Sequence, residues 1–387
     1  MRPVAITGVG QTPVREHWDV GLRELAVQAI WAALEDAADP KVEALFVGNM
    51  LSGMMASQEH LAVLIADYAG LRGIEAVKVE LACASGAAAF RQAVLAVASG
   101  AVRTAVAVGV EKLTERSIHA TTEGLASAAD ADYEAAMGIS FVALNALLMR
   151  RYMHEYGYQK SDFAPFVQLA HENAQANPNA LFHFEVGRDQ YEKSRMVADP
   201  ICLLDSSPVA DGAAAVVITA EETRAAGPQI PVWVHACEIG TDTIALDNRK
   251  DPLWMKGVEV STRKALQRAS LDHSRIRLFE LHDAFSIMSA LSLESAGFAE
   301  QGQAVRLANE GIFQLTGRLP MATAGGLKAR GHPVGATGIY QIVEAVLQFQ
   351  QRAPQPLQLE GVEYAMTQNI GGSGASVVTT ILGRNKP

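Results

Sequence analysis

Hydrophobic and polar positions recur with two different periods along this chain, and the changes of period mark its elements. Residues 77–81 alternate apolar and polar side chains, which predicts a strand. From Ser85 the apolar side chains recur at helical spacing, and Gly100 stands where a C-terminal cap is expected. Cys83 therefore lies at a strand-to-helix turn, among small residues that leave room for a ligand.

The rest of the chain shows strands that alternate with helices, which predicts a doubly wound α/β sheet. In the first half we expect strands at 4–10, 42–48 and 104–108, and helices at 21–37 and 59–69. The strand at 104–108 is fully apolar, which is typical of a buried parallel strand. In the second half we expect strands from 232 and at 277–281, 363–367 and 375–382, with helices at 257–269, 286–296 and 337–349. Each half thus repeats one βαβ plan, which indicates an internal duplication.

A segment of different character interrupts the first half. Residues 114–136 are polar and alanine-rich with little period, and helices are expected at 140–156 and 161–176 before strands return at 196–203 and 206–219. This segment is locally basic through Arg150, Arg151, Lys160, Arg188, Lys193 and Arg195. A solvated helical surface explains each basic residue taken alone, whereas a phosphate-bearing ligand would explain the local excess.

These changes of pattern define three parts. Residues 1–115 together with 196–226 form an N-terminal half that carries Cys83, and residues 116–195 form an inserted domain. After a linker at 227–231, which contains two prolines and a glycine, residues 227–387 form a C-terminal half.

Composition narrows the class of protein. The chain has 387 residues, of which 49% are hydrophobic and 19% charged, so we expect a well-folded globular protein with more than one subdomain. The net charge of −10 argues against a nucleic-acid-binding surface. Three distant cysteines predict free thiols in a reducing compartment, with no metal site and no disulfide framework. The longest apolar segment, 141–149, is interrupted by Asn145, so we expect no membrane span, and the cytoplasm is the expected location.

Cys83 is the first candidate for chemistry. A helix N-terminus carries partial positive charge and free N–H groups, so it should stabilise a thiolate and could hold an oxyanion. The alternative is that Cys83 is simply a small buried hydrophobic residue.

Three stretches of the second half supply the other candidates. His282 and Asp283 follow a strand, at the edge where α/β sheets carry their sites. Residues 324–338 place five glycines around His332, and residues 367–375 form a glycine-rich turn whose N–H groups could bind an oxyanion. Taken alone, His282 could be a structural histidine, and residues 367–375 could be a simple glycine hairpin. No G-K-[ST] is present, so a nucleotide loop is excluded.

Taken together, the motifs A-C-A-S-G, H-D-A-F, G-G-x-x-x-x-G-H-P-x-G-A-T-G and N-I-G-G resemble the thiolase superfamily over essentially the whole chain. The histidine of H-D-A-F is similar to the sterol-carrier-protein-type and archaeal branch, as are residues 109–114 and 205–212. The resemblance implies two duplicated halves in a five-layered α-β-α-β-α core with a helical loop domain.

The same resemblance implies the roles of the site residues. Cys83 would be the acyl-accepting nucleophile, His332 its base, and His282 would complete an oxyanion hole for the thioester oxygen. The N–H groups of Cys83 and Gly371 would form a second hole for the acyl-enzyme carbonyl. The insert would contact coenzyme A, which enters as a substrate and not as a tightly bound cofactor. The candidate contacts to coenzyme A are Arg188, Arg195, Ala324, Gly325 and Gly326.

One departure concerns the second cysteine that thiolases use as acid and base. This chain has Asn369 and Ala284 at the two positions where the family places it, and Asn369 is counted with the catalytic positions. The candidates for the proton transfer are His282, a bound water, or a residue that the sequence does not identify. The resemblance further implies a homodimer or a dimer of dimers. Some relatives of this branch work beside a small zinc-ribbon/OB-fold partner protein, which is a further expectation.

Several functions remain open at this point. Thiolytic cleavage of a 3-oxoacyl-CoA and Claisen condensation to acetoacetyl-CoA would use the same residues in opposite directions. A ketosynthase-like enzyme with a non-CoA acceptor would need a similar Cys-His-His set. A degenerate CoA-binding scaffold is compatible with the missing cysteine, and a papain-like hydrolase lacks its signature around Cys83.

Overall fold

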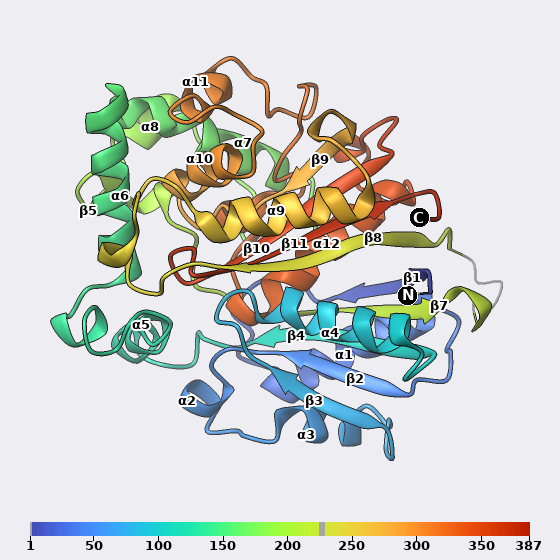
Figure 1. Ribbon diagram of the computed structural model, residues 1–387. Coiled ribbons are helices and arrows are strands. Elements are labelled where there is room, and N and C mark those ends of the chain that lie inside the picture. The colour runs from blue at the N-terminus through green and yellow to red at the C-terminus, as the bar shows by residue number, and fades with distance from the viewer. Residues whose placement is uncertain (1, 224–228) are drawn as a thin grey trace.

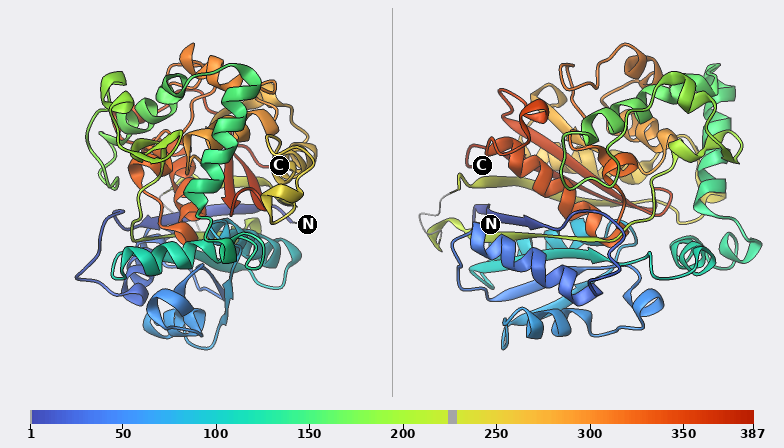
Figure 2. Two further views of the ribbon diagram at one scale, coloured as in Figure 1. Left: turned by 90° about the vertical axis from the view of Figure 1, so that its left-hand side faces the viewer. Right: turned by 180° about the vertical axis from the view of Figure 1, so that it is seen from behind.

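The computed structural model describes residues 2–223 and 229–387, so the first two residues of the expected linker, 227 and 228, lie outside the described part. Figure 1 shows an N-terminal half below, a C-terminal half above, and the inserted helices on one side of the molecule, most of them beside the upper half. Figure 2 shows the same two stacked halves from the side and from behind.

A nine-stranded sheet runs through both halves in the order β3-β2-β4-β7-β1-β8-β11-β10-β9. Among the described strands of this sheet, only the pairs β2–β3, β2–β4 and β9–β10 are parallel. The sheet is therefore mixed, where strand–helix alternation predicted a doubly wound one. The fully apolar β4 is parallel to β2 but antiparallel to β7, since burial on both faces and not direction sets its composition. The strands are β1 (Val4–Gln11), β2 (Ala44–Gly48), β3 (Glu75–Val79), β4 (Thr104–Glu111), β7 (Gly212–Ala220), β8 (Val232–Thr241), β9 (Ile276–Glu280), β10 (Tyr364–Gly371) and β11 (Ser376–Gly383).

The strand order repeats one plan in the two halves. From the centre outward, the N-terminal half runs β1, β7, β4, β2, and the C-terminal half runs β8, β11, β10, β9. In both, the first and last strands of the half lie side by side and the second strand lies further out. The two plans meet where β1 pairs with β8, through Ala5 opposite Trp233. The topology therefore agrees with the internal duplication expected from the sequence.

Helices complete five layers. Helices α1 (Leu22–Asp36) and α3 (Leu61–Tyr68) cover the outer face of the N-terminal strands, and α9 (Lys256–Ala269) and α10 (Ser286–Ser295) lie on the outer side of the other half. Between the halves lie α4 (Ser85–Ser99) and α12 (Thr337–Phe349), which share one apolar core with strands of both halves. On β4, Ala105 and Ala107 face this central layer while Val106 and Val108 face α1 and α3. The five-layered fold expected from the sequence is confirmed.

The inserted segment is mainly helical. It contains α5 (Ile118–Ala126), α6 (Phe141–Tyr156), α7 (Ala164–Ala174) and α8 (Arg188–Glu192), followed by the short strands β5 (Met196–Ala198) and β6 (Ile201–Cys202). Helices α6 and α7 were predicted from the sequence, whereas α5 was not, because its polar composition gives little helical period. The side chain of Ser117 caps α5 by accepting a hydrogen bond from the N–H of Ala120. Two short helices elsewhere are α2 (Ser52–Ala56) and α11 (Ala304–Asn309).

One described stretch, Ala82–Ser99, is long and apolar enough to span a membrane by length and composition, which the sequence pattern did not predict. Its mean hydropathy is 1.2, and 61% of it is buried inside the fold. It contains α4, whose alanine-rich surface packs in the central layer. The hydropathy is therefore explained by burial within the protein core.

Candidate active site

Cys83 lies in a tight turn between β3 and α4. Ala82 has a φ of 49°, in the left-handed region, where a residue with a side chain is strained by roughly 1–2 kcal/mol. The hydroxyl of Ser85 holds this turn, since it accepts the N–H of Leu81 at 2.9 Å and donates to the carbonyl of Ala82 at 2.6 Å. The turn projects Cys83 just before the helix begins.

Close backbone contacts bring the C-terminal half against this turn. A Cβ on Gly86 would lie 2.7 Å from the carbonyl oxygen of Gly335, and a Cβ on Gly109 would lie 2.7 Å from the Cα of Ala336. Both distances are too short for real atoms, so only glycine allows the loop that follows His332 to approach the start of α4. The small residues of the two motifs therefore fit against each other.

A buried carboxylate ties the same segments together. The side chain of Glu111 accepts hydrogen bonds from the N–H groups of Met50 at 2.8 Å, Leu51 at 3.1 Å and Gly335 at 3.1 Å, and from the Asn49 amide at 2.9 Å. Burial raises the pKa of Glu111 to about 7, although these three N–H groups favour the carboxylate. In the sequence, Glu111 was only one residue of the family-like stretch 109–114, and no role was predicted for it.

His332 is held in one tautomer by its neighbours. Its Nδ1 lies 2.7 Å from Thr337 Oγ1, whose hydroxyl donates to the carbonyl of Pro333 at 3.4 Å. Nδ1–H therefore donates to Thr337, and Nε2 keeps a lone pair that can accept a proton. Thr337 is the first residue of α12, so the helix fixes the ring.

His282 follows β9 and meets His332 in space. The two rings pack edge to face, with centres 5.1 Å apart and planes at 83°. The Asn369 amide donates to His282 Nδ1 at 3.2 Å, which leaves the ring proton on Nε2 as a donor. The structure thus brings Asn369 beside one of the two imidazoles.

A buried ion pair connects the loops that carry the two histidines. Asp283 Oδ1 accepts the N–H of Leu327 at 2.7 Å, and Lys328 Nζ donates to the Asp283 carbonyl at 2.8 Å and approaches Oδ2 at 3.3 Å. Ser289 completes the environment of the ammonium group at 3.2 Å. Because Lys328 belongs to the π-helical turn Gly326–Arg330, this pair fixes the H-D-A-F segment relative to the loop of His332.

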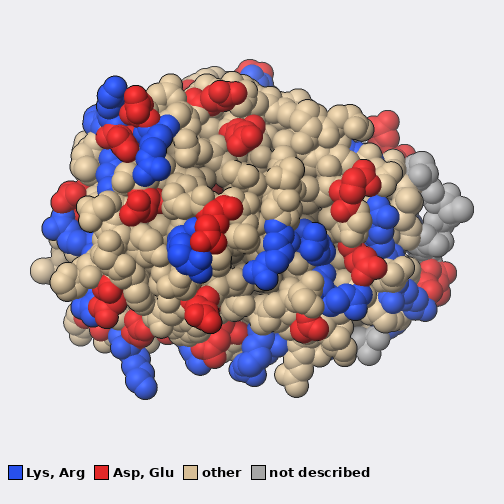
Figure 3. All heavy atoms as spheres, turned by 90° about the horizontal axis from the view of Figure 1, so that it is seen from above, with Lys and Arg blue, Asp and Glu red and all other residues tan. Residues whose placement is uncertain are grey.

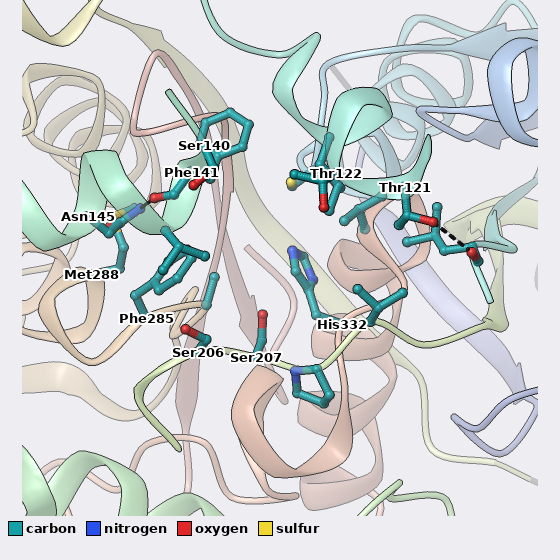
Figure 4. A pocket seen from close by; sticks show the side chains of 18 of the residues that line it. Thr121, Thr122, Ser140, Phe141, Asn145, Ser206, Ser207, Phe285, Met288 and His332 are labelled. Carbon is teal, nitrogen blue, oxygen red and sulfur yellow. Dashed lines mark hydrogen bonds between the residues drawn. The ribbon is translucent and has the colours of Figure 1, made fainter. Parts of the chain in front are cut away.

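A cavity of about 210 Å³ opens beside these groups and is lined by residues of both halves and of the insert. Figure 4 shows His332 pointing into it between Thr121 and Thr122 on one side and Phe285 and Met288 on the other. The lining residues are Cys83, Leu113, Ile118, Thr121, Thr122, Leu125, Ser140, Phe141, Val142, Asn145, Ser206, Ser207, Pro208, Val209, His282, Ala284, Phe285, Met288, His332, Val334 and Gly372. The thiol and both imidazoles therefore share one mainly apolar pocket.

The resting charges of the site differ from the sequence expectation. Burial and the nearby Glu111 raise the pKa of the Cys83 thiol to about 12, although the N–H of Gly372 acts in the opposite direction. Burial lowers the pKa of His282 to about 3 and that of His332 well below its ordinary value. Desolvation therefore outweighs the helix N-terminus that predicted a stabilised thiolate, and the site holds a neutral thiol beside neutral imidazoles.

The basic residues of the insert do not line this pocket. Arg151 and Arg188 pair with acidic side chains of the insert, and Arg150 pairs with Asp199 just after it. Arg195 is exposed on the surface of the insert. Figure 3 shows the face above the C-terminal half, where Lys and Arg side chains lie beside Asp and Glu and form no single basic patch. Arg188 instead lines a separate cavity with Glu172.

Ala324, Gly325 and Gly326, which were predicted to contact coenzyme A, have close packing contacts within the protein. The carbonyl of Ala324 accepts from the Asn177 amide at 2.8 Å, and a Cβ on Gly325 would lie 2.7 Å from that of Ala174. A Cβ on Gly326 would lie 2.5 Å from a carboxylate oxygen of Asp283. None of the three lines the pocket of Cys83 among the described residues.

The glycine-rich turn reaches the pocket at Gly372, the neighbour of the predicted Gly371. Gly371 ends β10, where its Cα faces the Leu81 carbonyl, and Gly372 lines the pocket. The N–H of Gly372 donates to the Cys83 sulfur. Gly372 has a φ of 61°, in the left-handed region that favours glycine.

The part of the chain that the structure describes offers no second thiol at the pocket. Cys202 is buried in β6, and Cys237 is buried in β8, where its sulfur accepts from the Thr380 hydroxyl at 3.3 Å. Ala284 lines the pocket and Asn369 lies behind His282. Within the described residues there is also no group of three or more His, Cys, Asp or Glu that could hold a metal ion.

Comparison with known proteins agrees with this geometry. The family described as thiolase, N-terminal domain, matches residues 4–222, and the thiolase C-terminal domain-like family matches residues 239–384. The chain belongs to the thiolase family. It is a thiolase-type acyltransferase, and coenzyme A thioesters are the substrates of the family.

Two relatives and one solved structure show how far the likeness extends. Acetyl-CoA acetyltransferase of Methanothermobacter thermautotrophicus is 42% identical over 386 residues, which is 99% of this chain and 100% of the relative. Sterol carrier protein 2 of Rattus norvegicus is 30% identical and covers 97% of this chain, with 71% of its own length matched. The solved structure of an Ltp2-ChsH2(DUF35) aldolase shares the fold with a TM-score of 0.85 at 24% identity, covering 98% of this chain and 97% of its own.

Proposed function

We propose that this enzyme transfers acyl groups between coenzyme A thioesters through an acyl-Cys83 intermediate. In one direction it would cleave a 3-oxoacyl-CoA with free CoA, and in the other it would condense two acetyl-CoA to acetoacetyl-CoA. The observation that carries this proposal is the convergence of Cys83, His282 and His332 on one apolar pocket. The 42% identity to an acetyl-CoA acetyltransferase supports the choice of substrate.

The first step requires a base because the thiol is protonated at rest. His332 would take the thiol proton at Nε2, since Nδ1 is engaged with Thr337. In cleavage, the sulfur bonds to C3 of the substrate, the C2–C3 bond breaks, and C2 takes a proton as acetyl-CoA leaves. The N–H groups of Gly372 and Cys83, which both favour the Cys83 thiolate, would stabilise the oxyanion at C3.

His282 is suited to the thioester oxygen of the departing enolate. With Asn369 donating to Nδ1, Nε2–H is a hydrogen-bond donor in the same pocket as the Cys83 sulfur. Free CoA would then attack the acyl-Cys83 carbonyl, the bond between the Cys83 sulfur and the acyl carbon would break, and the shortened acyl-CoA would leave. The proton of the CoA thiol would return to the Cys83 sulfur. Because no second thiol lines the described pocket, an imidazole or a water must carry the proton to and from C2.

A second candidate function is acyl transfer from Cys83 to an acceptor other than CoA. The alanine at 284 and the asparagine at 369 favour it, since both family positions for the second cysteine lack a thiol. This function would keep the acylation step and lose thiolysis.

A partner protein is part of the proposal. The aldolase with the same fold contains a DUF35 protein alongside Ltp2, as its name states, which supports testing a small zinc-ribbon/OB-fold partner here. Purification from the native host, followed by sizing and identification of co-eluting chains, tests this partner and the expected homodimer together.

Intact-protein mass spectrometry after addition of acetyl-CoA tests the function. We expect a mass increase of one acetyl group that free CoA removes and that Cys83→Ala abolishes. Cys237→Ala is the matched control, because that thiol lies in β8 away from the pocket and should leave the labelling in place. Labelling without thiolysis of acetoacetyl-CoA would support the second candidate, and the absence of labelling would overturn both.

A further inference from the structure

The turn that directs an N–H to Cys83 is built from residues with little conformational preference of their own. Residues 372–375 join β10 to β11, and the N–H of Gly372 donates to the Cys83 sulfur. Gly372 and Gly374 have φ values of 61° and 104°, which glycine adopts without steric strain. The backbone hydrogen bond that closes the turn, from the Gly374 N–H to the Gly371 carbonyl, is long at 3.4 Å. The direction of the Gly372 N–H therefore depends on contacts that the rest of the protein supplies.

Arg249 supplies such a contact. It lies in the loop between β8 and α9, and its Nη2 donates to the carbonyl of Ser373 at 2.5 Å. A hydrogen bond from a charged donor is stronger than one between neutral groups. The same nitrogen would lie 3.2 Å from a Cβ on Gly374, so the guanidinium packs against two successive residues of the turn. Arg249 thus contacts the turn directly after Gly372.

Two acidic side chains favour the charge of Arg249 at this place. Asp242 Oδ2 lies 3.8 Å from Arg249 Nε, and the N–H of Asp242 donates to the carbonyl of Ala375, at the end of the same turn, at 2.8 Å. The charge of Glu134 in the insert also favours the guanidinium. Because Glu134 accepts the N–H of Leu246 at 2.9 Å, the insert is bound to the loop that carries Arg249. Figure 1 shows this loop on the side of the molecule where α5 of the insert lies.

Stability alone does not account for this arginine. Its side chain is 1% exposed, and its Nε and Nη1 have no hydrogen-bond partner among the described residues. Burial lowers the pKa of Arg249, although Asp242 and Glu134 act in the opposite direction. A buried cation with unfilled donors adds little to the stability of a fold. The hydrogen bond to Ser373 is therefore better explained by a role at the site.

Arg249 does not line the pocket of Cys83, so it reaches the reacting atoms only through the turn. We propose that Arg249 is a positioning residue for the oxyanion hole: by holding the Ser373 carbonyl, it keeps the N–H of Gly372 directed at the Cys83 sulfur and at the acyl oxygen beside it. This proposal rests on the proposed function, because that oxygen belongs to acyl-Cys83. Loss of Arg249 should weaken stabilisation of the transition state and leave binding of the thioester almost unchanged.

The test removes the donor in the full-length enzyme with Arg249→Met. We expect the maximal rate of Cys83 acetylation by acetyl-CoA to fall by roughly 10–100-fold, somewhat less than complete loss of an oxyanion donor costs. The acetyl-CoA concentration that gives half of the maximal rate should change by less than about twofold. Arg249→Lys, which keeps a charged donor, should restore part of the rate. Rapid-quench mass spectrometry at several acetyl-CoA concentrations measures both quantities.

Arg2→Met is the matched control. Arg2 Nε likewise donates to a backbone carbonyl, that of Val97 at 2.7 Å, near the end of α4 that lies far from Cys83. This variant should leave both quantities unchanged, even where it lowers the melting temperature.

Alkylation of Cys83 without substrate separates positioning from a general loosening of the site. The N–H of Gly372 favours the thiolate, so Arg249→Met should slow the reaction with iodoacetamide at about pH 8 by roughly threefold or more. A site that is merely loosened would expose the sulfur and speed the reaction. Where Arg249→Met fails to fold, Arg249→Lys should show smaller losses in the same direction.

The outcomes separate the alternatives. Faster alkylation, or an unchanged rate of acetylation, in the Arg249 variants would overturn the proposal. A higher half-maximal concentration with an unchanged maximal rate would overturn it in favour of a contact between Arg249 and coenzyme A. A wild type that acetyl-CoA does not label would overturn the proposed function instead. The alkylation comparison needs no substrate, so it would still decide whether Arg249 directs the N–H of Gly372.

Discussion

The rings of His282 and His332 meet edge to face with their centres 5.1 Å apart, although fifty residues of chain separate them. Each is oriented by a different neighbour, His282 by Asn369 and His332 by Thr337. One therefore presents a proton at Nε2 and the other a lone pair. Two residues of the same type therefore offer opposite hydrogen-bonding groups to one pocket.

This difference predicts that substitutions of the two histidines separate the steps. His332→Ala should slow formation of acyl-Cys83 by about 10²–10⁴-fold, because the protonated thiol loses its base. His282→Ala should slow carbon–carbon cleavage by about 10²–10³-fold while acylation by acetyl-CoA stays closer to the wild type. Rapid-quench mass spectrometry measures the first step and steady-state thiolysis the second. Equal losses of both steps in either variant would contradict the division of roles.

The raised pKa of Cys83 predicts the pH dependence of its alkylation. Because burial and Glu111 raise the pKa to about 12, the thiolate fraction should increase tenfold per pH unit across the neutral and moderately alkaline range. The rate of reaction with iodoacetamide in the absence of substrate should therefore keep rising up to about pH 9 and beyond. A plateau at lower pH would show that the thiolate is stabilised, as the helix N-terminus alone would predict. Peptide mapping confirms which cysteine has reacted.

Glu111→Gln should destabilise the protein and disturb the site. The carboxylate accepts four hydrogen bonds, and glutamine would present an NH₂ group to donors that need an acceptor. We expect the free energy of unfolding to fall by about 2 kcal/mol, measured by denaturant titration. Thiolysis should fall as well, because Gly335 follows His332 by three residues. Glu115→Gln, at an exposed carboxylate, is the control, and an equal effect there would argue against a specific role of Glu111.

Gly86→Ala should push the loop that follows His332 away from the start of α4. The added methyl group would lie 2.7 Å from the Gly335 carbonyl, which belongs to the backbone and cannot rotate away. We expect at least a roughly tenfold loss of acylation together with a lower melting temperature. Gly187→Ala is a suitable control because its nearest contact would be an ordinary 3.6 Å. Unchanged acylation in Gly86→Ala would mean that the loop of His332 can shift without cost to the chemistry.

Local pattern was enough to find most elements and the residues that carry the chemistry. The helices at 140–156 and 337–349 and the strand at 277–281 were predicted to within a residue of α6, α12 and β9. Hydrophobic periodicity and motifs of small residues depend only on neighbours within a few positions, so they can be recognised from the sequence alone. Cys83, His282 and His332 stood out in the same way, each in a short motif with its own spacing.

Several properties of the site depend on contacts between distant segments, so only the tertiary structure determines them. The sequence determined which side chains could react, but burial reversed the expected shift of the Cys83 pKa, and the turn at Gly372 rather than Gly371 directed an N–H to the sulfur. Arg188 and Arg195 lie outside the pocket that Cys83 lines, so their contact with coenzyme A stays a prediction. Charge and hydrogen-bonding capacity belong to each residue, but desolvation and the direction of a donor arise only when the fold brings the two halves and the insert together.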